Sequence, residues 1–117
     1  MSIDKFLVFR VPMFGIANFG LTEVRLYEET INKVREGHPE VPAELPFMAH
    51  AVEQAILNPT QIEISYSNSY VFVDHTSTNL SGDPLRVPVR SVTATSGRVA
   101  SFFFASKAQA NVMWRKG

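Results

Sequence analysis

The pair Asn58-Pro59 divides the chain into two parts whose apolar residues repeat with different periods. Before this pair, apolar side chains recur at spacings of three and four, as on one face of an α-helix. After it, they alternate with polar side chains, as in a half-buried β-strand. A residue that precedes proline disfavours the helical conformation, so a helix must end here. The sequence therefore predicts helices before this pair and strands after it.

Two helices are predicted in the first part. One extends from Thr22, a suitable N-cap, to Gly37, which ends it. The other lies near Glu44 to Leu57, with Pro46 in its first turn. Their apolar faces are formed by Leu21, Val24, Tyr27, Ile31 and Val34 in the first helix, and by Phe47, Met48, Ala51, Val52, Ala55 and Ile56 in the second.

Strands are predicted at the start of the chain and throughout its second part. Pro88 cannot donate a hydrogen bond to a neighbouring strand, so it indicates an edge position or a bulge. Lys107 to Gly117 is predicted to form either a short helix or a tail. The predicted strands are Lys5 to Pro12, a hairpin of Ile62 to Tyr66 with Tyr70 to His75, a strand with Leu85, Val87 and Val89 on one face, and Val99 to Ala105.

This order of elements predicts an α+β fold in a single domain, residues 1–117. An N-terminal strand and two helices precede a four-stranded antiparallel meander, and the helices pack on one face of the sheet. A chain of 117 residues is long enough for one hydrophobic core without covalent staples.

Composition excludes several classes of site. The chain has no cysteine, and its three histidines are not spaced as metal ligands, so neither a metal nor a cofactor is expected. No signal peptide and no membrane-length apolar run is visible, which predicts a cytoplasmic protein without a membrane partner.

The net charge of zero conceals an asymmetry along the chain. Residues 1–83 hold five basic and all eleven acidic residues, whereas residues 84–117 hold six basic residues and no acidic one. Such a split indicates an anionic partner, or two sections that pack together and neutralise each other.

The two predicted helices resemble the barnase–EndoU–colicin–RelE-like group of small RNases, and most of all its phage-associated branch. The resemblance covers roughly residues 21–106 and is carried by Ile31, His38-Pro39-Glu40 and Asn58-Pro59. It implies an RNase-like fold with a site closed by a hydroxyl-bearing strand, for which Ser106 is the nearest equivalent. Thr30 departs from the pattern, because the family places a histidine before Ile31.

Cleavage of RNA without a metal requires a base, an acid and a cation that stabilises the phosphorane. Histidine suits the first two roles, and arginine suits the third. The candidate catalytic residues are therefore His38, His75, Arg90 and Ser106, and the candidate nucleic-acid-binding residues are Arg86, Arg90 and Lys107. The alternatives remain open: His38 as a helix cap, His75 as a strand-end surface residue, and the two arginines of the predicted strand as a solvated sheet face.

These residues support two functions of different classes. The first is a metal-independent endoribonuclease of toxin or phage-effector type, either active or catalytically degenerate. The second is a non-enzymatic module on the same fold that binds RNA or protein. The expected partners are RNA, an acidic inhibitor protein or a second copy of the chain. A small α+β domain with an apolar ligand pocket is a third alternative, which the many phenylalanines allow.

Overall fold

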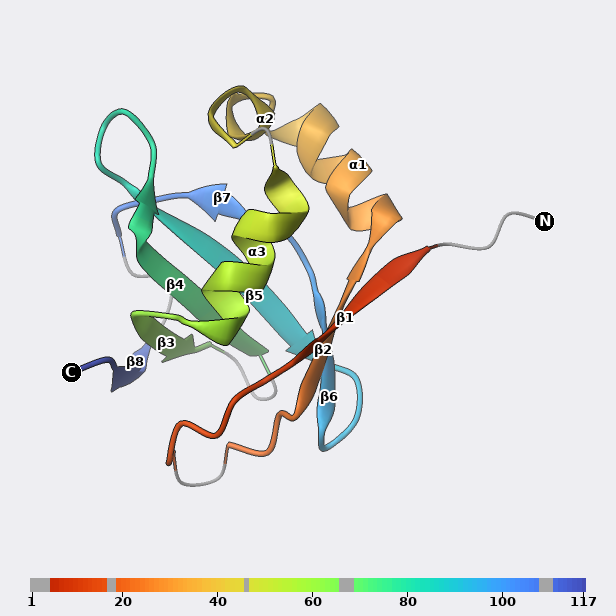
Figure 1. Cartoon of the computed structure of the whole chain (residues 1–117), viewed down its shortest axis with the longest axis vertical. Helices are drawn as coiled ribbons and strands as arrows, with labels where there is room; N and C mark the ends of the chain where they lie inside the picture. The colour runs from red at the N-terminus through yellow and green to blue at the C-terminus, as the bar shows by residue number, and fades with distance from the viewer. Residues whose placement is uncertain (1–4, 17–18, 46, 66–68, 108–110) are drawn as a thin grey trace.

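The computed structural model describes residues 5–16, 19–45, 47–65, 69–107 and 111–117, and its architecture is α+β (Figure 1). The α+β fold class predicted from the sequence is therefore confirmed. The elements of the first part are β1 (Phe6–Arg10), β2 (Glu23–Tyr27), α1 (Glu28–Gly37), α2 (Glu40–Glu44) and α3 (Met48–Leu57). The second part contributes β3 (Gln61–Ile64), β4 (Ser69–Thr78), β5 (Pro84–Ser91), β6 (Ser96–Val99), β7 (Phe103–Phe104) and β8 (Asn111–Arg115).

In the described parts of the chain, the strands form one mixed sheet of eight strands in the order β1-β2-β6-β5-β4-β3-β8, and β7 pairs with β5. Strands β2 and β6 are parallel, and the other pairs are antiparallel. The predicted hairpin is present as β3 and β4, although its turn residues 66–68 lie outside the described residues. The predicted four-stranded meander was thus too small, because β1, β2 and β8 extend the same sheet.

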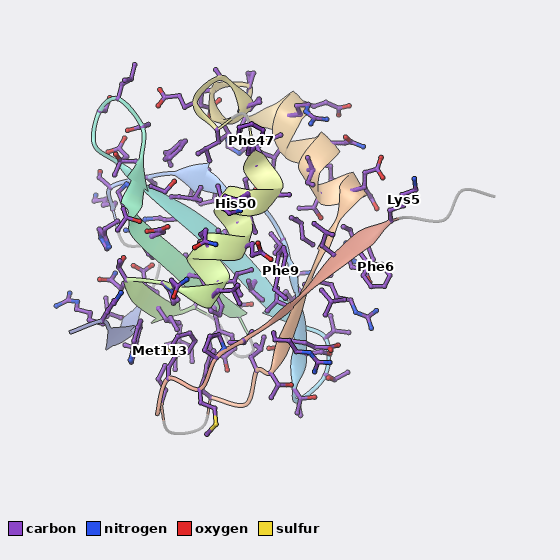
Figure 2. The ribbon with its side chains drawn as sticks, viewed as in Figure 1. Lys5, Phe6, Phe9, Phe47, His50 and Met113 are labelled. Carbon is purple, nitrogen blue, oxygen red and sulfur yellow. The ribbon has the colours of Figure 1, made fainter. Side chains whose placement is uncertain are left out.

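Helix α3 covers one face of this sheet and lies across β4 and β5, whereas α1 contacts the sheet mainly at β2 (Figure 1). Val52 and Ile56 on α3 are fully buried, and they belong to the same core cluster as Phe72 and Val87 of the sheet. Burial of side chains of this size contributes about 1.5–3 kcal/mol each. In β1, Phe9 lies on the side of α3 (Figure 2) and is also part of the core.

The segment predicted to be the first two turns of a helix is instead a strand. Val24 and Leu26 are buried and their neighbours are less so, which is the period of a strand. Val24 also fits the helical spacing of the residues that follow, so the local pattern is ambiguous. Hydrogen-bonded pairing with β1 on one side and with β6 on the other stabilises this segment as a strand. As a result α1 begins at Glu28 rather than near Thr22.

The end of α3 agrees with the sequence. The helix ends at Leu57, and the backbone N–H of Asn58 donates to the carbonyl of Gln54 as the cap. Its start at Met48 is later than predicted, and the short helix α2 was not predicted. Pro46 lies outside the described residues. Within the described parts of the chain, no helix is long and apolar enough to cross a membrane.

Pro88 marks an interruption beside β5. Its carbonyl accepts from the N–H of Ala100 at 2.9 Å. In an antiparallel pair the N–H and C=O of one residue point to the same neighbouring strand. Proline has no N–H, so Pro88 cannot donate the second hydrogen bond of its pair with Ala100. Here β6 ends at Val99 and β7 begins at Phe103. The single predicted strand from Val99 to Ala105 is therefore divided in two, and Pro88 lies at an interruption rather than at an edge of the sheet.

The last residues form β8, which corrects the prediction of a helix or tail. This strand pairs with β3, whereas β7 pairs with β5, so the chain passes from one side of β5 to the far side of β3. At the start of this crossing, the Arg86 side chain donates from Nε to the carbonyl of Ala105 at 2.7 Å and from Nη2 to the carbonyl of Ser106 at 3.4 Å.

The sheet face opposite α3 contains a buried ion pair. Nη1 of Arg86 donates to Oε2 of Glu63 at 2.7 Å, and both side chains are almost completely buried. The same carboxylate oxygen accepts from Nε2 of Gln61 at 2.7 Å, and Gln61 accepts from Arg115 at 3.2 Å. The network joins β3, β5 and β8 and the start of the crossing segment.

Removal of one partner of this pair should destabilise the protein strongly. Glu63→Leu leaves the buried guanidinium of Arg86 without its carboxylate, and we expect the free energy of unfolding to fall by about 3–5 kcal/mol. The double variant Glu63→Leu/Arg86→Met removes both charges and should recover most of this loss. Urea unfolding followed by circular dichroism measures both values. Lys33→Met, which breaks an exposed ion pair, is the control and should change stability little. If the free energy of unfolding of Glu63→Leu were as high as that of Lys33→Met, the prediction would be contradicted.

Candidate functional site

Three arginines occupy neighbouring positions on three adjacent strands. Arg25 of β2 is the register partner of Arg98 of β6, which is in turn the partner of Arg90 of β5. Register partners point to the same side of a sheet, and adjacent strands are about 4.8 Å apart, so the row spans about 10 Å. These residues alternate with the buried Val24, Val99 and Val89, so the row lies on the face opposite the core. Like charges at paired positions repel each other, so an anion would stabilise the row.

Two aromatic rings contact the first two arginines. The guanidinium of Arg25 lies 4.7 Å from the centre of the Phe6 ring, and that of Arg98 lies 4.5 Å from the centre of the Tyr27 ring. The two rings are themselves 5.2 Å apart. Phe6 is 44% exposed and points away from the body of the molecule (Figure 2). Cation–π contacts therefore hold both guanidinium groups beside an accessible aromatic pair.

Arg90 differs from the other two arginines. Its side chain is exposed, and it makes no hydrogen bond, ion pair or ring contact with the residues that the structure describes. It is thus a guanidinium with its donors directed to solvent, beside a second arginine.

A hollow of about 360 Å³ lies at this end of the row, and we call it the arginine hollow. Arg90 and Arg98 line it together with Glu29 and Lys33 of α1. The helix follows β2 directly, and Glu29 and Lys33 are four residues apart, so both project from the same side of its first two turns. Thr30, which is buried, also lines the hollow and donates from Oγ1 to the carbonyl of Val99 at 3.4 Å.

Positive charges around the arginine hollow lower the pKa of Glu29. Glu29 pairs with Nζ of Lys33 at 3.0 Å. This hydrogen bond and the charge of Lys33 lower the pKa of Glu29, and the charge of Arg98 lowers it further. At the other end of the row, a hydrogen bond with Tyr27 raises the pKa of Arg25. Glu29 therefore remains ionised at neutral pH, and Lys33, Arg90 and Arg98 surround it with a net positive charge.

A second hollow, of about 340 Å³, adjoins the first and shares Arg90 and Ala100 with it. We call it the serine hollow. Val71 and Pro88, which are register partners on β4 and β5, form an apolar part of its lining. The lining also includes the hydroxyls of Ser65 and Ser69 and the ring of Phe103.

Neither of the predicted catalytic histidines lines these two hollows. His38 follows α1, where Nδ1 lies 3.1 Å from Oε1 of Glu40, and its ring stacks on Phe103 at 5.9 Å. The pKa of Glu40 is lowered, first by a hydrogen bond from its own backbone N–H and then by His38. His75 lies near the end of β4 and hydrogen-bonds to Thr60. Of the predicted catalytic residues, the structure places Arg90 at these two hollows and places His38 and His75 outside them.

Of the remaining predicted residues, Arg90 lines both the arginine hollow and the serine hollow. Arg86 was predicted to contact nucleic acid, but its side chain is 2% exposed and is paired with Glu63, so its guanidinium is not accessible at the surface. The absence of acidic residues after position 83 made it look unpaired, but its partner comes from the first section. Ser106 and Lys107 are exposed and line neither hollow, and Ser106 contacts Arg86 through its carbonyl.

Sequence reasoning missed most of the residues that form this surface. Arg25 and Tyr27 were assigned to a helix, with Tyr27 on its apolar face, so their position beside Phe6 was not predicted. The alternation of Val24 and Leu26 with charged residues was the signal that could have revealed it.

A third hollow on the opposite face contains His50. Gln54 and Asn58 of α3 and Asp74 of β4 also line it. His50 points outward from α3 (Figure 2), and its Nδ1 lies 3.9 Å from Glu53. Among the described residues, no group of three or more histidine, aspartate or glutamate side chains is arranged to hold a metal ion.

Comparison of the chain with protein-family models, curated proteins and solved structures gave no match.

The pKa of Glu29 tests the geometry of the arginine hollow. Lys33→Ala removes a hydrogen bond and a positive charge, and should raise this pKa toward its ordinary value. Arg98→Ala removes a weaker effect and should raise it less. The side-chain carboxyl carbon, followed by NMR as the pH is varied, reports both shifts. Arg35→Ala, on the same helix but outside the hollow, should leave the pKa unchanged, and equal shifts in all three variants would contradict this arrangement.

Proposed function

We propose that the face formed by β1, β2, β6 and β5 binds single-stranded RNA. The observation that carries the proposal is the row of Arg25, Arg98 and Arg90, which ends in a solvent-exposed guanidinium without a partner among the described residues. Guanidinium groups match the geometry of phosphate oxygens, and their charges give most of the affinity of proteins for nucleic acid.

The exposed ring of Phe6 and the partly buried ring of Tyr27 favour a single strand over a duplex. Phe6 and Tyr27 lie beside the arginines, and unpaired bases can stack on such rings. Bases within a duplex already stack on each other and are not available for this contact. The choice of RNA rests on the resemblance of the His38-Pro39-Glu40 and Asn58-Pro59 segments to small RNases.

The arginine row can be tested by its effect on salt dependence. Each of Arg90→Ala and Arg98→Ala removes about one phosphate contact, so the slope of log affinity against log salt should become shallower by about 0.7. Fluorescence anisotropy with a labelled single-stranded RNA of mixed sequence, measured at several salt concentrations, gives these slopes. Arg35→Ala removes the same charge from the exposed side of α1 and should change the slope much less.

Two outcomes would contradict the proposal. One is no binding of RNA by the unaltered protein at low salt. The other is binding that Arg35→Ala and Arg98→Ala weaken equally, which would indicate a general charge effect instead of this surface.

Cleavage of RNA in the arginine hollow is a second candidate, favoured by the carboxylate of Glu29 beside Arg90, Arg98 and Lys33. Glu29 would accept the proton of a 2′-hydroxyl, and the 2′-oxygen would attack the phosphorus as the bond to the 5′-oxygen breaks. The leaving 5′-oxygen would take a proton from water, and the arginines would stabilise the phosphorane. The lowered pKa of Glu29 keeps it ionised but makes it a weak base, so binding is the better-supported function.

Incubation of RNA with the protein in EDTA separates the two candidates. If Glu29 is the base, fragments with 2′,3′-cyclic phosphate ends should form, and Glu29→Gln should slow their formation at least a hundredfold. His38→Ala should leave the rate nearly unchanged, because His38 does not line the hollow. Intact RNA after prolonged incubation excludes this cleavage and is what the binding function predicts.

A further inference from the structure

The serine hollow has the size and lining of a small-molecule site. Its volume of about 340 Å³ lies within the range of ligand pockets. The paired Val71 and Pro88 and the ring of Phe103 give it apolar surfaces, and the hydroxyls of Ser65 and Ser69 can form hydrogen bonds at its rim. Such a lining suits a flat ring with polar edges.

The position of Pro88 explains why the hollow exists. Because proline has no N–H, the neighbouring chain cannot continue its pairing, and residues 100–102 separate β6 from β7. Phe102 turns into the core and is fully buried, whereas Phe103 lines the hollow. Irregular points of this kind in a sheet often lie beside binding sites.

Two contacts connect this hollow to its surroundings. Arg90 lines both hollows, so an anion that it binds would lie at their shared boundary. His38 stacks on Phe103, and this contact orients the aromatic wall.

We infer that the serine hollow binds the base and ribose of a nucleotide whose phosphate occupies the arginine hollow, an inference that rests on the proposed function. The phosphate is held by Arg90 and Arg98. The base stacks on Phe103 and lies over Pro88, and Ser65 and Ser69 bond to polar atoms of the base or the ribose. The protein thus recognises one nucleotide within the strand in a pocket, and contacts the others through phosphate and through stacking on Phe6 and Tyr27.

The test compares nucleoside 5′-monophosphates of all four RNA bases with inorganic phosphate. Each is titrated into the ¹⁵N-labelled full chain, and amide shifts are followed by NMR. We expect all five compounds to shift the amides of Arg98 and Val99, and only the nucleotides to shift those of Val71 and Phe103. Nucleotides should bind about tenfold more tightly than phosphate, which is the contribution of one stacked base.

A substitution that fills the serine hollow tests whether a base binds there. Ser69→Phe places a bulky ring in the serine hollow, and should reduce nucleotide affinity to that of phosphate while phosphate binding and thermal stability are retained. Ser77→Phe makes the same substitution on the same strand, in the hollow that contains His50, and should leave the nucleotide preference intact.

The outcomes distinguish this inference from the function on which it rests. Equal affinities for phosphate and nucleotides, with shifts confined to the arginine hollow, would overturn the base pocket and leave RNA binding by the arginine row in place. Failure of phosphate, nucleotides and RNA alike to bind would overturn both.

Discussion

The buried pair of Glu63 and Arg86 is the interaction on which the arrangement of the second part depends. It connects β3 and β5 across β4, and it joins the acidic section of the chain to the basic one. Through the carbonyl of Ala105 it also anchors the segment that crosses toward β8. A buried charge is costly unless its partner and its hydrogen bonds are complete, so these elements can be buried only together.

Two arginines on β5 show how burial determines the role of a residue. Arg86 and Arg90 both point from β5 to the face opposite α3, four residues apart. The first lies where the chain turns toward β8 and is buried, whereas the second lies beside the interruption at Pro88 and is exposed. One arginine therefore stabilises the sheet, and the other is available to an anion.

Much of the fold could be predicted from the sequence, and little of the candidate site. The end of α3 at Asn58 and the alternation in β5 depend on local chemistry, and both predictions were confirmed. The strand β2 could not be separated from α1, because Val24 fits both periods and only its neighbours in the sheet decide. His38 and His75 were plausible by residue type, but their positions depend on where distant elements pack. Arg98 attracted no attention because its importance comes from its partners on two other strands.

The sequence by itself determined the α+β class, the boundary at Asn58-Pro59 and the burial of Leu85, Val87 and Val89 on one face of a strand. These features follow from backbone restriction and apolar periodicity, which act over a few residues. Tertiary structure alone decided which arginines are buried and which form a row, because register between strands pairs residues that are far apart in sequence. The partners of Arg86 and of Arg98 lie 23 and 73 residues away at Glu63 and Arg25, and no local pattern encodes such distances.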